Sequence, residues 1–374
     1  MILGIIPARG GSKGIPRKNI RPICGKPVIA WSIESAQKSK LLDDFVVSTE
    51  DDEISRISRS YGARVLDRPS QLATDESTTL SVIQHAISEI NADLVVVLQP
   101  TSPIRDDDLI DRCIQHLRDT KADCMATGSI CTLKEYGTHD NKRRQDTPGF
   151  FRDDGNIYVI KSDLIKSGKW TSENMERLVL EDDQCCEIDT EDELFIVDKL
   201  LERRVINKIK SIDSDIKLLV CDVDGVLTDG GISYSPDGER LKKFNTRDGM
   251  GIELLHQQGI PTAFLTKENS PIVAERAKKL NIPHLFMGVQ DKVKVLQEAL
   301  VELNLQWEQV AFIGDDVNDT GLLAKVGFSA CPGDAIDANK MIANYVCRLK
   351  GGEGCVREVC DLLLAAKNDL ATTV

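Results

Sequence analysis

The amino-acid sequence predicts an α/β protein with two doubly wound, mainly parallel sheets. Short apolar runs alternate with segments of helical periodicity along the chain, which is typical of βαβ units. The alternation restarts at Lys217–Val220, after a charged helical segment at about 190–207. A length of 374 residues is enough for two domains of ordinary size. We therefore expect one domain over residues 1–210 and a second over 216–374, joined by a short polar linker.

The expected elements follow one another in regular order. In the first domain, apolar runs predict buried strands at 2–6, 45–49, 63–66, 94–98 and 123–127. Helical spacing of apolar residues predicts helices between them, at 27–38, 51–61, 77–90 and 106–119. In the second domain we expect strands at 217–220, 262–265, 285–287 and 310–313. Parallel strands end at the same edge of a sheet, so ligands should bind at that edge.

Composition excludes several classes of protein. A hydrophobic content of 41% with 29% charged residues is too apolar for a disordered chain. A net charge of −13 argues against nucleic acid or an anionic membrane as a partner. The apolar run Leu94–Leu98 is far too short to span a bilayer. The 11 cysteines lack zinc-type spacing, so we expect reduced thiols. The opening segment lacks a basic leader, so we expect a cytoplasmic protein.

The loop Ala8–Asn19 follows the first predicted strand and combines three glycines with four cations, namely Arg9, Lys13, Arg17 and Lys18. Glycines let backbone N–H groups approach phosphate oxygens, and the cations would neutralise a triphosphate or pyrophosphate. The glycine spacing fits neither a Walker loop nor a dinucleotide-binding fingerprint. The competing interpretation is a solvated glycine-rich turn with surface cations.

A second candidate site lies at the strand ends of the second domain. Asp222 and Asp224 follow a buried strand, and such close carboxylates are costly without a cation such as Mg²⁺ between them. One carboxylate could take a phosphoryl group as an aspartyl phosphate, and the other could serve as acid and base. Thr266, Lys292 and the acidic loop Gly314–Asp319 fall at further strand or helix ends. The alternative is that each is an ordinary cap or loop residue.

The first half resembles the CMP-sialic acid synthetases, or acylneuraminate cytidylyltransferases. The resemblance begins in the glycine-rich loop and continues through Ser48–Asp51, Arg68-Pro69, Leu98–Arg105, Arg143–Gln145, Gly155–Tyr158 and Glu187–Thr190. It implies a Rossmann-like nucleotidyltransferase that uses CTP and a sialic acid and releases pyrophosphate. By the resemblance, Arg9, Lys13 and Lys18 hold the phosphates, with Arg9 and Lys18 catalytic, and Asn19 and Arg68 contact the nucleoside.

The same resemblance implies a sugar site and a metal site. The sugar would be contacted by Gln99, Arg144, Gln145 and Tyr158, with residues borrowed across a dimer. Glu187 and Asp189 would bind Mg²⁺, and their spacing in an extended segment puts both carboxylates on one side. Members of the family often carry Asp at the position of Glu187.

The second half, about 217–365, resembles the small capless phosphatases of the haloacid dehalogenase superfamily. These enzymes act on Kdo 8-phosphate or on 9-phosphates of sialic acids, and they form tetramers. The resemblance implies that Asp222 is the nucleophile and Asp224 the acid/base, with Asp222, Asp315 and the backbone carbonyl of Asp224 at the Mg²⁺ and Asp316 and Asp319 supporting. Sugar contacts are implied for Glu268, Arg276 and Lys279. Thr266-Lys267-Glu268 stands where Kdo enzymes usually have Thr-Gly-Arg, which favours a 9-phosphate.

Together the two halves predict a bifunctional, homo-oligomeric enzyme. A 9-phosphatase would make the free sialic acid that a cytidylyltransferase activates. Three alternatives stay open: a cytidylyltransferase whose second domain only supports oligomerisation, Kdo-type specificity, or a non-catalytic nucleotide sensor. The sugar could be N-acetylneuraminate, Kdn or a legionaminate-like acid.

Overall fold

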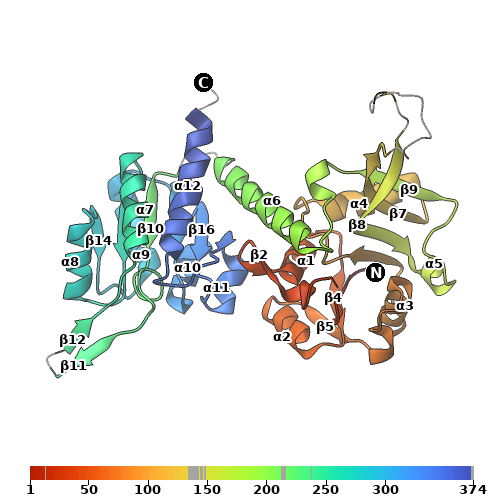
Figure 1. The fold of residues 1–374 in the computed structure, drawn as a ribbon, viewed down its shortest axis with the longest axis horizontal. Helices are drawn as coiled ribbons and strands as arrows, with labels where there is room; N and C mark the ends of the chain where they lie inside the picture. The colour runs from red at the N-terminus through yellow and green to blue at the C-terminus, as the bar shows by residue number, and fades with distance from the viewer. Residues whose placement is uncertain are drawn as a thin grey trace. The chain divides into compact units, whose positions relative to one another are not determined.

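The computed structural model describes residues 1–12, 14–133, 143, 146, 149–211, 216–236 and 238–371. The chain divides into two compact units, Met1–Leu200 and Leu201–Val374 (Figure 1). The division falls inside helix α6 (Glu191–Lys210), whereas the sequence placed it at a linker whose residues 212–215 lie outside the described part. Each unit is built on a sheet with helices around it, so the predicted fold class is confirmed.

The sheet of the first unit has seven strands among the described residues, in the order β5-β4-β1-β6-β8-β7-β9. Five of them match predicted strands: β1 (Ile2–Pro7), β4 (Asp44–Thr49), β5 (Arg64–Asp67), β6 (Leu94–Leu98) and β7 (Cys124–Cys131). The sequence did not predict β8 (Phe150–Lys161) or β9 (Met175–Val179). Strand β8 runs antiparallel to both β6 and β7, so the sheet is mixed on this side. A separate small ladder joins β2 (Pro22–Ile23) and β3 (Lys26–Pro27).

The helices of the first unit lie close to their predicted positions: α1 (Val28–Lys38), α2 (Asp52–Ser60), α3 (Thr79–Glu89) and α4 (Leu109–Thr120). Shorter pieces are α5 (Ser162–Lys166) and the 3-10 turns η1 (Lys18–Ile20), η2 (Ser70–Leu72) and η4 (Asp182–Gln184). Ile83 and Ile87 of α3 pack against Leu3, Ile5 and Val95 of the central strands. This apolar packing holds β1 in place, and the glycine-rich loop leaves the sheet at the carboxyl end of that strand.

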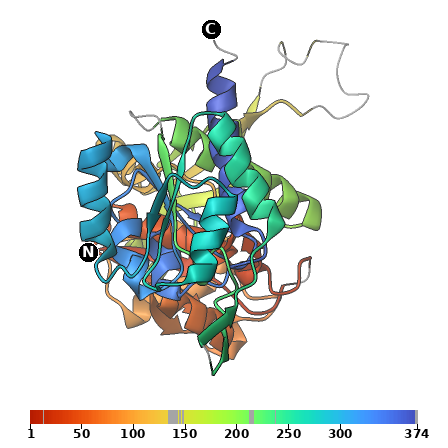
Figure 2. The same ribbon diagram turned by 90° about the vertical axis from the view of Figure 1, so that its left-hand side faces the viewer.

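The second unit has a six-stranded parallel sheet among its described residues. Its strands, in spatial order, are β14 (His284–Phe286), β13 (Thr262–Leu265), β10 (Leu218–Cys221), β15 (Val310–Ile313), β16 (Phe328–Cys331) and β17 (Tyr345–Val346). A hairpin of β11 (Ser233–Ser235) and β12 (Gly238–Leu241) projects from this sheet (Figures 1 and 2).

Helices lie on both faces of this second sheet (Figure 2). They are α7 (Thr246–Gln257), α8 (Pro271–Lys279), α9 (Lys292–Leu303), α10 (Thr320–Leu323), α11 (Asp337–Ile342) and α12 (Cys355–Ala371), with 3-10 turns η5 (Trp307–Gln309) and η6 (Val317–Asp319). Leu296 of α9 and Leu322 of α10 pack on one face against Val220 and Phe312. Because the central strands are parallel, β10, β13 and β15 all end at the same edge.

No helix in the described parts of the chain combines the length and the apolar content that crossing a bilayer requires. All cysteines except Cys131 and Cys186 are buried.

Candidate functional sites

The glycine-rich loop after β1 is held by close contacts with two neighbouring segments. A Cβ on Gly10 would lie 2.4 Å from Asp51 Oδ2, and one on Gly14 would lie 2.4 Å from the backbone oxygen of Asp189. The N–H of Gly10 also donates to Glu50 Oε1 at 2.7 Å. Glycine at positions 10 and 14 is therefore required by close approach to other parts of the same unit.

Beyond this loop lies a cavity of about 380 Å³. It is lined by six of the residues that the sequence singled out: Arg9, Lys18, Asn19, Arg68, Gln99 and Asp189. They come from four separate segments of the chain, and the fold brings them to the carboxyl edge of the sheet. Residues of the segment 72–79 complete the wall.

Two cations at this cavity are each paired with a carboxylate from another segment. Arg9 Nη1 lies 3.1 Å from Asp75 Oδ1. Lys18 Nζ lies 2.9 Å from Asp189 Oδ1 and donates to the backbone oxygen of Ile188 at 2.8 Å. Both pairs are partly open to solvent, so each is worth about 1 kcal/mol or less and an anionic ligand could displace the carboxylate.

Asn19 and Arg68 are buried beneath the cavity wall. Asn19 Nδ2 donates to the backbone oxygen of Arg9 at 2.9 Å, which fixes the start of the loop. Arg68 Nε donates to Ser48 Oγ at 3.2 Å. Burial lowers the pKa of Arg68 to about 10, against the opposing effect of Glu50, so the guanidinium stays charged at neutral pH.

Arg17 has a different position from the other loop cations. It is not among the described residues that line the cavity. Its guanidinium donates to Asp51 Oδ1 at 2.8 Å and to Glu53 Oε2 at 2.6 Å. Asp51 in turn caps α2 through the N–H of Ile54, and the hydrogen bond from Arg17 lowers the pKa of Asp51 to about 2. Arg17 therefore anchors the loop to α2.

The carboxylate pair Glu187 and Asp189 lies between this cavity and a second one of about 410 Å³. Asp189 lines both cavities, whereas Glu187 lines the second and accepts a hydrogen bond from Thr101 Oγ1 at 3.3 Å. Burial, followed by the charge of Asp189, raises the pKa of Glu187. A partly buried acid whose pKa is raised, beside a second acid, fits a site for a divalent cation.

The predicted sugar contacts are only partly described. Gln99 lines the first cavity. Tyr158 lies on β8, where its hydroxyl donates to Asp153 at 2.8 Å and its ring meets Trp170 edge to face. Lys13, Arg144 and Gln145 lie outside the described residues.

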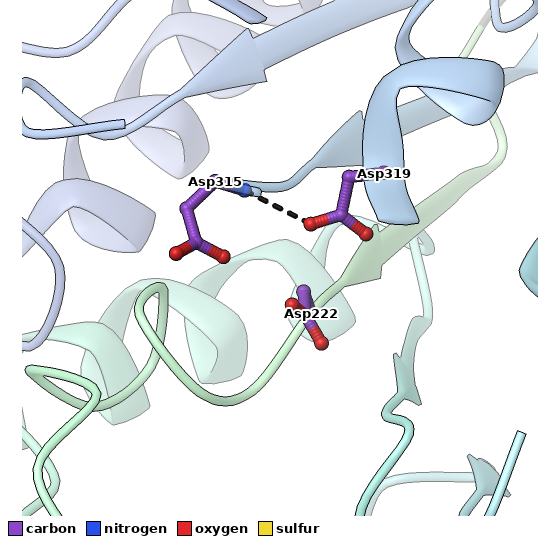
Figure 3. Close-up of side chains that lie close together, drawn as sticks. All are labelled: Asp222, Asp315 and Asp319. Atoms are coloured by element: carbon purple, nitrogen blue, oxygen red, sulfur yellow. Dashed lines mark hydrogen bonds between the residues drawn. The ribbon is translucent and has the colours of Figure 1, made fainter. Parts of the chain in front are cut away.

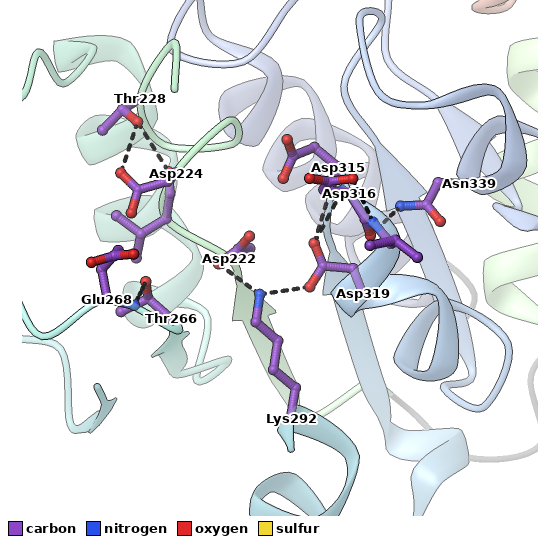
Figure 4. A network of polar contacts seen from close by, with 12 residues as sticks. Asp222, Asp224, Thr228, Thr266, Glu268, Lys292, Asp315, Asp316, Asp319 and Asn339 are labelled. Carbon is purple, nitrogen blue, oxygen red and sulfur yellow. Dashed lines mark hydrogen bonds and ion pairs between the residues drawn. The ribbon is translucent and has the colours of Figure 1, made fainter. Parts of the chain in front are cut away.

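In the second unit, Lys292 stands between two buried carboxylates at the end of β10 (Figure 4). Its Nζ lies 2.8 Å from Asp222 Oδ1 and 2.7 Å from Asp319 Oδ1. All three side chains are almost completely buried. Burial alone would lower the pKa of Lys292, but the two carboxylates raise it above its usual value, so the ammonium stays charged.

Asp222, Asp315 and Asp319 each offer one oxygen, and these oxygens lie within 4.8 Å of one another (Figure 3). Burial, and then the charge of Asp319, raises the pKa of Asp315 to about 7 and also raises that of Asp222. Asp315 Oδ1 is buried without a hydrogen-bond partner in the described structure. Three acids facing one lysine leave an excess of negative charge, and oxygen ligands are those that Mg²⁺ prefers, so this cluster fits that ion.

The Asp224 carboxylate is not part of this cluster. Its Oδ1 lies 2.5 Å from Lys242 Nζ and 3.4 Å from Thr228 Oγ1. Asp319, which the resemblance gave only a supporting role, stands in the cluster instead. The turn η6 folds Asp319 back so that its Oδ2 accepts the N–H of Asp315 at 3.0 Å. The repeated acids of Gly314–Asp319 signalled such a turn, but nothing in the sequence signalled Lys242.

The remaining predicted residues of the second unit lie on its neighbouring elements. Thr266 follows β13 and its Oγ1 accepts the N–H of Glu268 at 3.2 Å (Figure 4). The Arg276 guanidinium lies 5.4 Å from the centre of the Phe244 ring and donates to the backbone oxygen of Asn245 at 3.2 Å. Lys279 is exposed near the end of α8. Arg276 is thus engaged with the start of α7.

Known proteins match both halves of the chain. The cytidylyltransferase family matches residues 3–193, and the haloacid dehalogenase-like hydrolase family matches residues 256–358. N-acylneuraminate cytidylyltransferase A of Danio rerio is 29% identical, over 98% of this chain and 89% of its own. The 3-deoxy-D-manno-octulosonate 8-phosphate phosphatase KdsC of Yersinia pestis is 46% identical, over 42% of this chain and 84% of its own.

A solved structure of the same kind of phosphatase, from Moraxella catarrhalis, contains magnesium, phosphate and KDO. It is 35% identical, covers 46% of this chain and 99% of its own, and has a TM-score of 0.42. The sequence and family matches agree with the two resemblances read from the motifs.

Proposed function

Since this chain belongs to the cytidylyltransferase family, and its second half to the family of the KdsC phosphatases, we propose that it is a bifunctional enzyme of sialic acid activation. The first unit transfers CMP from CTP to a sialic acid and releases pyrophosphate. The second unit removes the 9-phosphate from the sugar precursor. The match to N-acylneuraminate cytidylyltransferases over nearly the whole chain supports a sialic acid as the common substrate.

The observation that carries the first activity is the single cavity shared by Arg9, Lys18, Asn19, Arg68 and Gln99. Arg9 and Lys18 hold the phosphates of CTP in place of their present carboxylate partners. Asn19 and Arg68 contact the nucleoside, and Gln99 contacts the sugar. The anomeric hydroxyl of the sugar then attacks the α-phosphorus in line, and the two cations stabilise the charge that develops on the leaving pyrophosphate.

Metal is part of this first site in our proposal. Glu187 and Asp189 would hold Mg²⁺, which supplies positive charge to the phosphates when bound. Asp189 is already at the cavity, where Lys18 neutralises it. Lys13, Arg144, Gln145 and Tyr158 are proposed as further phosphate and sugar contacts.

In the second unit, Asp222 attacks the phosphorus and the bond to the sugar oxygen breaks. Asp224 protonates that oxygen and later takes a proton from the water that hydrolyses the aspartyl phosphate. Thr266 and Lys292 hold the phosphoryl oxygens. Asp222, Asp315 and Asp319 would hold Mg²⁺, together with the backbone carbonyl of Asp224, and the ion would neutralise the phosphate. Glu268, Arg276 and Lys279 are proposed sugar contacts.

The experiment measures both reactions with the full chain. CTP is combined with N-acetylneuraminate, Kdn or a legionaminate-like acid, and pyrophosphate release is measured. Phosphate release is measured from a sialic acid 9-phosphate and from Kdo 8-phosphate. If none of these acids supports pyrophosphate release from CTP, the first proposal is overturned.

The phosphatase assay separates the remaining alternatives. Preference for Kdo 8-phosphate, the substrate in the names of the KdsC relatives, would replace the 9-phosphate proposal. Phosphate release that is absent, or unchanged in Asp222→Asn, would favour a second unit that serves only oligomerisation. We propose a dimer through the first unit and a tetramer through the second, which the mass of the particle in solution tests.

A further inference from the structure

A buried lysine that the sequence did not single out lies beside Asp224. Lys242 directly follows β12, and its side chain is fully buried. Its Nζ lies 2.5 Å from Asp224 Oδ1 and 3.2 Å from Glu239 Oε1. Desolvating an ammonium is costly, so a lysine buried in this way depends on the carboxylates beside it.

The two oxygens of Asp224 have different surroundings. Oδ1 contacts Lys242 Nζ and lies 3.4 Å from Thr228 Oγ1. Oδ2 is buried and has no hydrogen-bond partner among the described residues. In Figure 4 the Asp224 side chain lies on the same side of the site as Thr266 and Glu268, apart from Lys292 and the Asp315 loop. One oxygen is therefore held by the protein and the other is left unpartnered.

We propose that Lys242 is a positioning residue for Asp224, one that holds Oδ1 so that the carboxylate keeps the orientation in which it moves protons. This inference rests on the proposed phosphatase function. When Asp222 bonds to phosphorus and the bond to the sugar oxygen breaks, that oxygen takes the proton from the Asp224 carboxyl group. In the second step, water gives a proton to the Asp224 carboxylate and bonds to phosphorus, and the bond between Asp222 and phosphorus breaks.

Glu239 completes the arrangement and connects it to the hairpin. It balances the charge of Lys242, and its other oxygen, Oε2, accepts a hydrogen bond from Ser270 Oγ at the start of α8. The hairpin strand β12 is thus tied to α8 on one side and to the loop of Asp224 on the other. Lys242 and Thr228 together leave Asp224 Oδ1 little freedom to rotate, which is what proton transfer to a defined oxygen requires.

Leaving groups of different basicity separate positioning from a merely structural role. A sugar oxygen leaves as a strongly basic alkoxide and needs the proton, whereas p-nitrophenolate leaves without one. In Lys242→Met we expect kcat on the sugar phosphate to fall about 10- to 100-fold, less than the roughly 10²- to 10⁴-fold that general acid catalysis supplies, because Asp224 itself is retained. With p-nitrophenyl phosphate as substrate, the initial burst of p-nitrophenolate should change less than about 3-fold. Asp222 still attacks the phosphorus, and only the later hydrolysis, in which Asp224 is the base, is slowed.

Two further variants control this experiment. If Lys242→Met alone is unstable, the double variant with Glu239→Gln replaces it, because it removes the ammonium together with one of its two carboxylate partners. The double variant should show the same difference between the two substrates. Lys243→Met changes the neighbouring, exposed lysine and should leave both rates unchanged. Equal losses on both substrates, or no loss, would overturn the role of Lys242 while the phosphatase function stands. A wild-type enzyme that hydrolyses neither substrate would overturn both.

Discussion

The two candidate sites of this chain are built on opposite electrostatic plans. At the first cavity, Arg9 and Lys18 are each neutralised by a carboxylate, and their side chains are 33% and 15% exposed to solvent. At the second site, Asp222 and Asp319 share the single cation Lys292, and all three side chains are at most 6% exposed. The first site can exchange its carboxylates for an anionic ligand, whereas the second needs an added cation to be balanced. The two proposed phosphate sites of one chain therefore need different ligands for their charge balance.

The largest expected effect separates the two activities. Asp222→Asn removes the proposed nucleophile, and we expect phosphate release to fall by roughly 10⁴- to 10⁶-fold, as in enzymes that lose a covalent nucleophile. CTP-dependent pyrophosphate release from the same preparation should be unchanged, because Asp222 belongs to the other unit. A parallel loss of both activities would mean that the sites are not independent.

The next effect concerns stability. Lys292→Met leaves Asp222 and Asp319 buried without their cation, which should lower the free energy of unfolding by about 3–5 kcal/mol. Saturating Mg²⁺ should reduce this loss, because the ion replaces the missing charge. Denaturant unfolding with and without Mg²⁺ measures both effects.

The matched control is the same substitution at the first site. Lys18→Met breaks an ion pair whose carboxylate is 64% exposed, so it should cost about 1 kcal/mol or less. Equal losses in the two variants would remove the contrast between the sites.

The same variant is expected to affect catalysis at the first site. Without the ammonium of Lys18, the charge developing on pyrophosphate loses one stabilising group, and kcat/KM for CTP should fall by about 10²- to 10³-fold. Arg21→Ala is the control, since Arg21 lies on the same segment but pairs with Glu191. Steady-state pyrophosphate release measures the effect, and a larger loss in Arg21→Ala would contradict the assignment of Lys18.

The smallest effect concerns a carboxylate of the second unit that lies outside the metal cluster. It shows whether burial alone disfavours the ionised form of such a group in the folded protein. Burial raises the pKa of Asp248 to about 6, and its Oδ2 has no partner in the described structure. The unfolded group titrates near 3.9, so its folded form binds the extra proton between about pH 4 and 6. Wild-type stability from this group is therefore full below pH 4 and lost as the pH rises to 6.

Asp248→Asn cannot titrate and escapes this loss. Its free energy of unfolding relative to wild type should rise by about 2 kcal/mol between pH 4 and pH 7.5. Denaturant unfolding of both proteins at the two pH values measures the change. A difference that stays constant with pH would show that Asp248 is not neutral at low pH in the folded protein.

Much of the architecture could be read from the chain because local patterns determine it. Alternating apolar and helical segments placed β1, β4, β6 and β10 to within a few residues. Strand β8 was missed although its second half, Ile157–Ile160, is an apolar run, because residues 150–155 are largely polar and the strand pairs antiparallel, outside any βαβ pattern. Asp153 and Tyr158 lie on this strand.

The sequence alone determined the fold class, the two family resemblances and the residue types of each site, because glycine, lysine and aspartate at strand ends follow from the local pattern. Only the tertiary structure decided which of these groups meet. It put Asp319, which was expected only in a supporting role, beside Asp222 and Asp315, and it gave the Asp224 carboxylate a lysine that follows the hairpin as partner. The physical reason is that such meetings depend on how a turn bends and how buried charges are compensated, and residues many positions apart in the chain supply that compensation.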